Sequence, residues 1–227
     1  MHLLLRCSVT VGFAVVISSC ASVPSSRVEG ITSEREFVTI LDERHARIAR
    51  SVDDRALKGP LRISLPHAEL ASGLEQTGIS PRQAQLVANH AARSLCTAVS
   101  SYVSVEEPST PEALHPRITV TGIKASSAVV SGASSVLGIF SPVPLRIPAG
   151  LGALSIDAEL VDSDGRQVAA MHWARGANSV TNSARLSSIG DAWQLAAKFG
   201  KEFARAVLDT DNKRAGLQRA RLPAADV

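Results

Sequence analysis

The four residues Ile17-Ser18-Ser19-Cys20 close an apolar run near the N-terminus and constrain the fold of this 227-residue chain more than any other feature. The run before them starts at Cys7, is too short to span a bilayer, and follows a short segment that carries Arg6. Small residues at 18 and 19 let a signal peptidase reach the backbone, and a thiol at position 20 can accept a diacylglycerol. We therefore predict a lipoprotein signal over residues 1–19 and lipidation of Cys20. The alternative is an ordinary secretory signal in which Cys20 is incidental.

The residue after Cys20 bears on which membrane the chain would reach. Several acyl chains on one cysteine anchor stably, because each buried CH2 contributes ~0.8 kcal/mol. An aspartate after the lipidated cysteine tends to retain lipoproteins in the inner membrane of Gram-negative bacteria. Ala21 stands there instead. For a Gram-negative host, we therefore expect a lipid anchor in the outer membrane with the domain on the periplasmic face.

Removal of the signal leaves about 200 residues, which is the length of one domain. Residues 20–32 are small and polar and contain a proline, so we predict a flexible tether there. Residues 211–227 mix charges with few large apolar side chains, which is typical of a disordered tail. The organisation expected is therefore a single periplasmic domain over residues 33–210.

The composition excludes several classes of partner. Aromatic residues make up 4% of the chain, which argues against an aromatic platform for sugars or nucleic acid. The formal charge of +3 arises from 24 basic and 21 acidic residues, a near balance that gives no indication of nucleic-acid binding. Cys7 leaves with the signal and Cys20 carries lipid, so Cys96 stands alone. No disulfide is expected, and Cys96 is expected to be a small buried apolar residue.

Three helices are expected. Ser33-Glu34-Arg35-Glu36 matches a capping box ahead of apolar residues at helical spacing, which predicts an N-terminal surface helix. Ser80-Pro81-Arg82-Gln83 is a strong helix start, and Ser188 with Asp191 resembles a second capping box. The apolar face of the last helix is expected to contain Ile189, Ala192, Trp193, Ala196, Phe199, Phe203 and Val207.

Alternating or short apolar runs predict the strands. They lie at Leu61–Leu65, Tyr102–Glu106, Ile118–Gly122, Leu154–Leu160 and Gln167–Ala174. The last two are expected to form a hairpin. Because the strands mostly follow one another, we predict an α+β fold with a mostly antiparallel or mixed sheet of about five strands. Two helices would pack on one face of this sheet.

Residues 128–156 form the least ordinary segment, because they carry one charge, Arg146, in a small and apolar sequence with three prolines. The prolines exclude a regular spanning helix across the whole segment. Three alternatives remain: a buried helix with a covering loop, a segment that rests on a membrane or another subunit, and a re-entrant or barrel-forming segment. The candidate interaction surface in this segment consists of Val136, Leu137, Ile139, Phe140, Val143 and Leu145.

No catalytic, metal-binding or cofactor-binding site is predicted. The histidines of the expected domain are scattered singly, and Asp162-Ser163-Asp164-Gly165 lacks the distal glutamate of a calcium loop, so it predicts a hairpin turn. His172 beside Trp173 could serve a small pocket, although a histidine with one solvated face is the simpler interpretation. Asp157 and Glu159 share one strand face and could act as an acid–base or cation-binding pair. A solvated outer face explains them more simply, so we expect a protein that is not an enzyme.

The second half of the chain resembles an uncharacterised family of bacterial lipoproteins, known as a domain of unknown function. The resemblance is carried by the hairpin sequence Glu159–Val168, by Gly190-Asp191-Ala192-Trp193 at the start of the last helix, and by the apolar connection before the hairpin. It extends from the strand at Leu61 to the last helix. The resemblance implies an envelope lipoprotein and assigns no catalytic residue.

These observations predict a non-enzymatic envelope lipoprotein that acts as a binding or assembly module. Its partner would be an envelope protein or a second copy of the chain, because an exposed apolar patch the size of residues 128–156 would otherwise invite aggregation. The alternative is a carrier that holds a small apolar ligand or lipid between the sheet and this segment.

Overall fold

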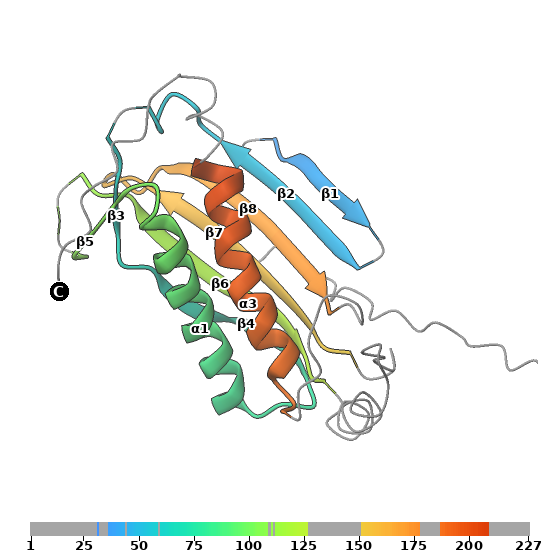
Figure 1. Ribbon diagram of the computed structural model, residues 1–227. Coiled ribbons are helices and arrows are strands. Elements are labelled where there is room, and N and C mark those ends of the chain that lie inside the picture. Colours follow the sequence, from blue (N-terminus) through green and yellow to red (C-terminus); the bar gives the residue numbers. More distant parts are fainter. Residues whose placement is uncertain are drawn as a thin grey trace, which may run out of the picture.

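A six-stranded mixed sheet with two helices on one face forms the centre of the computed structural model (Figure 1). The structure describes residues 31, 36–43, 45–58, 60–108, 110, 112–126, 151–177 and 187–208. The six strands are β1 Val38–Glu43, β2 Ala46–Val52, β4 His67–Thr77, β6 His115–Lys124, β7 Ala153–Val161 and β8 Gln167–Gly176. The helices are α1 Pro81–Val99 and α3 Gly190–Phe203, and the π-helical turn η1 Ala204–Leu208 extends α3. A separate parallel pair consists of β3 Arg62–Ser64 and β5 Ser104–Glu106.

The strand order is β1-β2-β8-β7-β6-β4. Every neighbouring pair is antiparallel except β4 and β6, which run parallel because α1 and β5 connect them. This arrangement confirms the predicted α+β fold with a mixed sheet and two helices on one face.

The hairpin β7–β8 occupies the middle of the sheet, and its turn is fixed by Asp162. The Asp162 carboxylate accepts hydrogen bonds from the Arg166 amide at 2.8 Å and from the Arg166 Nε at 3.0 Å. Partial burial raises the pKa of Asp162, but the hydrogen bonds from Arg166 and the Asp164 amide outweigh it and hold this pKa below its ordinary value. Gly165, at φ +78°, completes the turn. The carboxylate is thus used by the turn itself, as the sequence predicts.

The two helices begin differently. At α1, the Ser80 hydroxyl accepts from the Gln83 amide and the Gln83 side chain accepts from the Ser80 amide, so the predicted capping box is confirmed. At α3, the capping pair of Ser188 and Asp191 is wrong, because Ile189 is the N-cap residue and makes no side-chain capping bond. Asp191 is instead fully buried and accepts hydrogen bonds from the Ser126 hydroxyl and the Gly152 amide, both at 2.8 Å. Its carboxylate therefore connects α3 to the chain on either side of residues 127–150.

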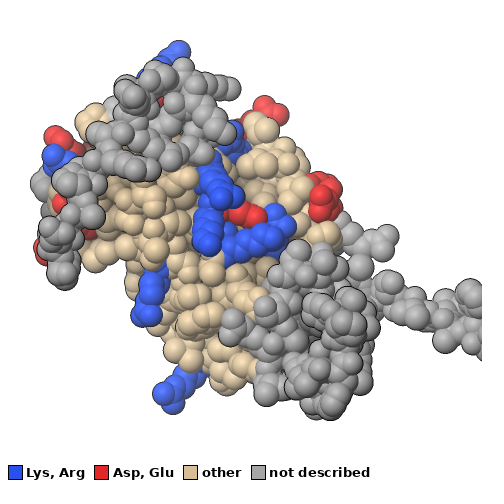
Figure 2. Space-filling view, viewed as in Figure 1, with Lys and Arg blue, Asp and Glu red and all other residues tan. Residues whose placement is uncertain are grey.

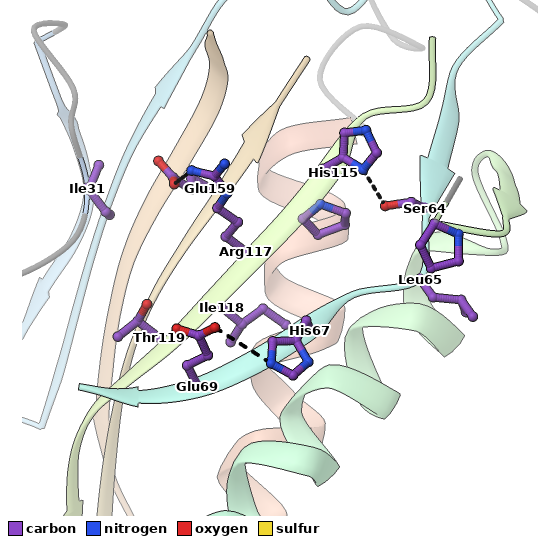
Figure 3. A pocket seen from close by; sticks show the side chains of 12 residues that line it. Ile31, Ser64, Leu65, His67, Glu69, His115, Arg117, Ile118, Thr119 and Glu159 are labelled. Atoms are coloured by element: carbon purple, nitrogen blue, oxygen red, sulfur yellow. Dashed lines mark hydrogen bonds and ion pairs between the residues drawn. The ribbon is translucent and has the colours of Figure 1, made fainter. Parts of the chain in front are cut away.

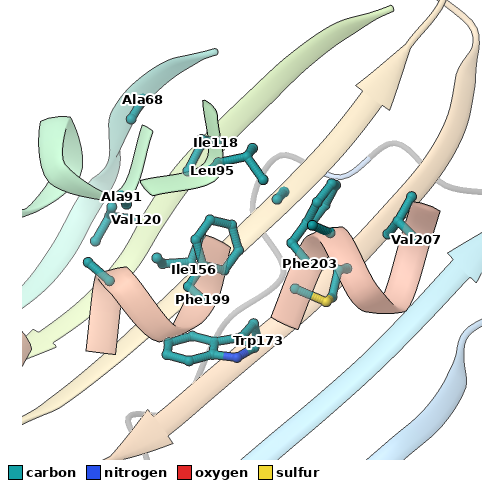
Figure 4. Close-up of a cluster of buried hydrophobic side chains, with 14 of the residues drawn as sticks. Ala68, Ala91, Leu95, Ile118, Val120, Ile156, Trp173, Phe199, Phe203 and Val207 are labelled. Carbon is teal, nitrogen blue, oxygen red and sulfur yellow. The ribbon is translucent and has the colours of Figure 1, made fainter. Parts of the chain in front are cut away.

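The core lies between the helices and the sheet (Figure 4). Trp173 on β8 packs edge-on against Phe199 of α3, with ring centroids 5.7 Å apart, and Phe199 contacts Phe203. The helices cross closely at Gly200, where a β-carbon would lie 2.4 Å from the Ser94 carbonyl oxygen of α1. Burial of these apolar side chains drives the packing of the two layers.

The predicted N-terminal helix is wrong, because residues 38–52 form the hairpin β1–β2. The sequence Val38-Thr39-Ile40 is rich in β-branched residues, which favour strands. In β2, Ala46 and Ile48 are buried on either side of the exposed Arg47, an alternation of period two. Pairing of β2 with β8, which sets Ile48 opposite Trp173, completes the strand and overrides the helical spacing.

Several predictions lie outside the described residues. They include the signal over 1–19, lipidation at Cys20, the tether apart from Ile31, the tail, and the six residues of the candidate interaction surface. Within the part of the chain that the structure describes, no helix combines the length and the apolar character that crossing a membrane requires.

Candidate functional site

The face of the sheet opposite the helices carries charged and polar side chains in two cross-strand rows. One row pairs Glu69 with Thr119, Asp157 and His172 across β4, β6, β7 and β8. The other pairs His67 with Arg117 and Glu159 across the first three of these strands. Side chains directly opposite each other on neighbouring strands are close enough to interact. We call these seven side chains the polar face.

Asp157 and His172 form a buried pair in the middle of the polar face. The His172 Nδ1 atom lies 2.9 Å from the Asp157 Oδ1 atom, and the Phe37 ring lies against the imidazole with centroids 4.3 Å apart. Asp157 is 2% exposed, and its Oδ2 atom has no hydrogen-bond partner in the described part of the chain. The solvated outer face expected for this carboxylate is therefore wrong.

Glu159 is equally buried, at 4% exposure, and is bonded at both carboxylate oxygens. Arg117 lies 3.4 Å from Oε1, and the Gln167 side-chain amide donates to Oε2 at 2.8 Å. The solvated face expected for Glu159 is thus also wrong. The Glu159 carboxylate holds one side of the Arg117 guanidinium. Because the Arg117 side chain is 62% exposed, its other N–H donors can reach a ligand.

A cavity of about 520 Å³ opens beside this arginine (Figure 3). His115 and Ser64 line one part of it and are joined by a hydrogen bond of 3.0 Å between Nδ1 and the hydroxyl. His67 and Glu69 on β4 line another part, with 3.6 Å between Nε2 and Oε1. Apolar groups from Ile31, Leu65, Pro108, Pro116 and Ile118 contribute to the wall. The cavity can therefore contact a ligand that has both polar and apolar parts.

A hydroxyl–imidazole pair lies in this cavity. Ser64 and His115 could form a nucleophile–base pair, but the His115 ring has no carboxylate to orient it among the described residues. The described residues also contain no group of three or more side chains suited to hold a metal ion. Cys96 on α1 is half-buried, more exposed than expected for a small core residue. The described side chains of this cavity offer hydrogen-bond donors and acceptors to a ligand.

A comparison with known protein families shows to which family the chain belongs. The model of a family described as proteins of unknown function, DUF3313, matches residues 68–203, which is more than half of the chain. The chain belongs to this family. None of the functionally curated proteins is similar enough to the chain to count as a match.

The solved structures to which this DUF3313 chain is similar share little sequence with it. A PelC dodecamer variant from Paraburkholderia phytofirmans is 15% identical, with a TM-score of 0.39, and 69% of this chain covers 95% of that one. A second PelC dodecamer from the same organism is 14% identical over the same shares, with a TM-score of 0.37. A Xanthomonas campestris protein of the family DUF330 is 14% identical, with a TM-score of 0.38, covering 70% of this chain and 88% of that one.

The DUF3313 match extends from β4 to the end of α3, so it includes both helices and most of the polar face. Asp157, Glu159 and His172, which the sequence singled out, do lie together. Sequence reasoning missed His67 and Glu69 because β4 was not predicted. It missed Arg117 because the predicted strand began at Ile118, and the antiparallel pairing of β6 with β7 sets Arg117 opposite Glu159. The sequence signal that could have predicted β4 is the alternation of charged and apolar residues in His67-Ala68-Glu69-Leu70.

Proposed function

We propose that this protein is a non-enzymatic envelope lipoprotein that acts as a binding or assembly module. In this proposal, Cys20 carries the lipid and the domain faces the periplasm from the outer membrane of a Gram-negative host. The domain then binds an envelope protein or a second copy of the chain.

The observation that carries the proposal is the exposed apolar edge of the sheet at β1. Among the described strands, β1 has one neighbour, β2, so no described strand pairs with its other edge. Val38 is 64% exposed and Ile40 is 47% exposed on this strand. Natural proteins usually protect such edges with charges or proline, and the charges of β1, Asp42 and Glu43, lie at its C-terminal end, so they leave the half with Val38 and Ile40 apolar. This edge therefore favours pairing with a partner strand.

The assembly can be tested by light scattering after size-exclusion chromatography of the full chain in detergent. We expect a discrete oligomer or a stable complex for the wild type, and its loss in the double variant Val38→Lys/Ile40→Lys. Leu65→Lys/Leu86→Lys is the matched control, because it also introduces two lysines at exposed apolar residues, 50% and 46% exposed, that lie outside β1. A wild-type monomer without a partner, or full assembly in a folded double variant, would contradict the role of β1.

The apolar sequence of residues 128–150 supports a second contact in the same assembly. Replacing Val136, Leu137 and Phe140 together with polar residues should abolish association if this segment contributes to it. Retained association in a folded triple variant would remove the segment from the proposal and leave β1 as the contact.

The lipid anchor has its own test. Mass spectrometry of the N-terminal peptide from membrane fractions should show diacylglycerol on Cys20 and cleavage after Ser19. The variant Cys20→Ser should lose the acyl mass and leave the membrane. A wild-type peptide that carries no lipid would contradict this part of the proposal.

The cavity favours a second candidate function, a carrier of a small ligand or lipid. Its volume of about 520 Å³ lies in the range typical of small-molecule sites. Native mass spectrometry of gently purified protein should show bound mass, which Arg117→Ala should reduce if the polar end of the ligand contacts the guanidinium. A protein that is consistently empty would argue against the carrier.

A further inference from the structure

The outward surface of the two helices is charged with one sign. Exposed cations lie along α1, α3 and η1 at Arg82, Arg93, Lys198, Lys201 and Arg205. Across the same three elements, the sequence contains two acidic residues, Asp191 and Glu202, and α1 contains none. We call the outward side of α1, α3 and η1 the helix surface.

Neither acidic residue neutralises the helix surface. Asp191 is fully buried, where it accepts the hydrogen bonds from Ser126 and Gly152. Glu202 accepts from the Trp173 indole at 2.6 Å and forms an ion pair of 2.9 Å with Arg175. Both carboxylates therefore interact with partners inside the fold, so neither offsets the positive charge of the five exposed cations.

Figure 2 shows the helix side of the molecule in the orientation of Figure 1. Several Lys and Arg side chains lie near the middle of this face around one acidic group, further ones stand singly toward the lower left, and the other acidic side chains lie toward the outline. Charges of one sign on one face produce a field that attracts an oppositely charged surface.

Apolar groups accompany the cations at the end of the surface where α3 begins. Leu86 is 46% exposed and Trp193 is 37% exposed, although the sequence predicts Trp193 on the buried face of the last helix. The Trp193 indole stacks on the His90 imidazole of α1, with centroids 3.8 Å apart and planes 7° from parallel. Partial burial lowers the pKa of His90, and the charge of Arg93 lowers it further. The hydrogen bond to the Trp193 backbone raises this pKa but is outweighed. His90 is therefore neutral at neutral pH, and the stacked rings add to the apolar area.

We propose that the helix surface docks on an anionic lipid bilayer. Lysine and arginine close to an anionic membrane each contribute to binding, and tryptophan prefers the boundary between headgroups and acyl chains. The cations are spread along two neighbouring helices, as contact with the diffuse charge of a lipid surface requires. An acidic protein would more often be recognised by a concentrated cluster with fixed hydrogen-bond partners.

The test measures binding of the full chain to vesicles of phosphatidylglycerol and phosphatidylcholine against vesicles of phosphatidylcholine alone. An N-terminal anchor would contribute to both kinds of vesicle, so the ratio of the two affinities reports the helix surface. We expect the wild type to prefer the anionic vesicles and to lose that preference as salt is raised. Lys198→Glu/Lys201→Glu should reduce the ratio by at least about tenfold.

Lys58→Glu/Arg62→Glu provides the matched control, since it changes the charge equally at exposed residues outside the helices. It should lower the ratio clearly less than the helix variant. Trp193→Ala tests the apolar part and should weaken binding to anionic vesicles at constant charge. Equal binding of the wild type to both vesicles, or equal effects of the two charge variants, would overturn the proposal. Binding to polyglutamate without a preference for anionic vesicles would assign the surface to an acidic protein and also overturn it.

Discussion

The two faces of β7 are both buried, yet they are built from opposite kinds of side chain. All nine residues of this strand are buried. Leu154 and Ile156 face the helices and pack in the apolar core, whereas Asp157 and Glu159 lie on the opposite side and are held by specific polar partners. The comparison teaches that an alternating pattern identifies which side of a strand is apolar, but not whether the polar side is in water.

The two faces should respond differently to mutation. Apolar packing is non-directional, so its loss depends on the volume removed and on the cavity left behind. The polar face depends on pairs, so removal of one partner leaves the other buried without compensation. Variants on the two sides of β7 can therefore separate these two kinds of stability.

The largest effect is expected on the helix side, from Phe199→Ala. Phe199 is fully buried between Trp173 and Phe203, and such a truncation typically costs about 3–5 kcal/mol. Urea or guanidinium denaturation measures the change. Leu86→Ala is the control, because Leu86 is 46% exposed and its change should stay within about 0.5 kcal/mol. A loss below about 1 kcal/mol for Phe199→Ala would show that the core does not depend on this ring.

On the polar face, the two members of one pair should differ. His172→Ala leaves the Asp157 carboxylate buried with neither oxygen bonded, which we expect to cost about 3 kcal/mol. Asp157→Ala leaves one imidazole nitrogen without a partner and removes an oxygen that already lacked one, so its cost should be nearer to 1–2 kcal/mol. The double variant should resemble Asp157→Ala. The same denaturation experiments measure all three variants. A loss of stability in the double variant equal to the sum of the two single losses would contradict the coupling of Asp157 and His172.

The helix crossing provides a third comparison, between two glycines needed for different reasons. Gly200→Ala places a methyl group against the backbone of α1, and we expect a net loss of about 2 kcal/mol despite the better helix propensity of alanine. Gly165→Ala meets nothing within 4 Å, but its φ of +78° strains any other residue by about 1 kcal/mol. Thermal or chemical denaturation of both variants tests whether Gly200→Ala loses more stability than Gly165→Ala. A smaller loss at Gly200 would mean that the helices can shift apart.

The sequence predicts the middle of the fold better than its edges. The β7–β8 hairpin and the start of α1 are determined by local signals, namely an alternating run, a turn and a capping box, and each was predicted correctly. The strands β2 and β4 depend on β8 and β6, which lie far away in the chain, whereas β1 pairs with its neighbour β2. Local spacing gave a helix for β1 and β2. Ile48, for example, fits a helical stripe and a strand equally well until Trp173 stands opposite it.

The candidate site follows the same division. Asp157, Glu159 and His172 were noticed because they lie on one predicted hairpin, but their burial was not foreseen. Their burial depends on Phe37, Arg117 and Gln167, which tertiary pairing brings to the face. Arg117 could not be placed opposite Glu159 without the antiparallel register of β6 against β7.

The smallest effect concerns pH and His90, whose imidazole is partly buried against Trp193 and lies near the charge of Arg93. Because the fold lowers the pKa of His90 below its ordinary value of about 6.5, the unfolded chain binds a proton first as the pH falls. The contribution of His90 to stability is therefore complete above about pH 6.5 and is lost as the pH falls through the lowered pKa. As the pH falls from 7.5 to about 5, the melting temperature of His90→Gln should decline less than that of the wild type.

Arg93→Gln sharpens this prediction because it removes the second cause of the shift and leaves the first in place. The pH dependence of Arg93→Gln should lie between those of the wild type and His90→Gln, since partial burial of the stacked imidazole still disfavours its charged form. If all three proteins decline equally below about pH 6.5, protonation of His90 is not coupled to folding, and the stack with Trp193 tolerates the charged ring. If Arg93→Gln matches His90→Gln, the cation alone accounts for the shift, and the stack contributes apolar area to the helix surface without lowering this pKa.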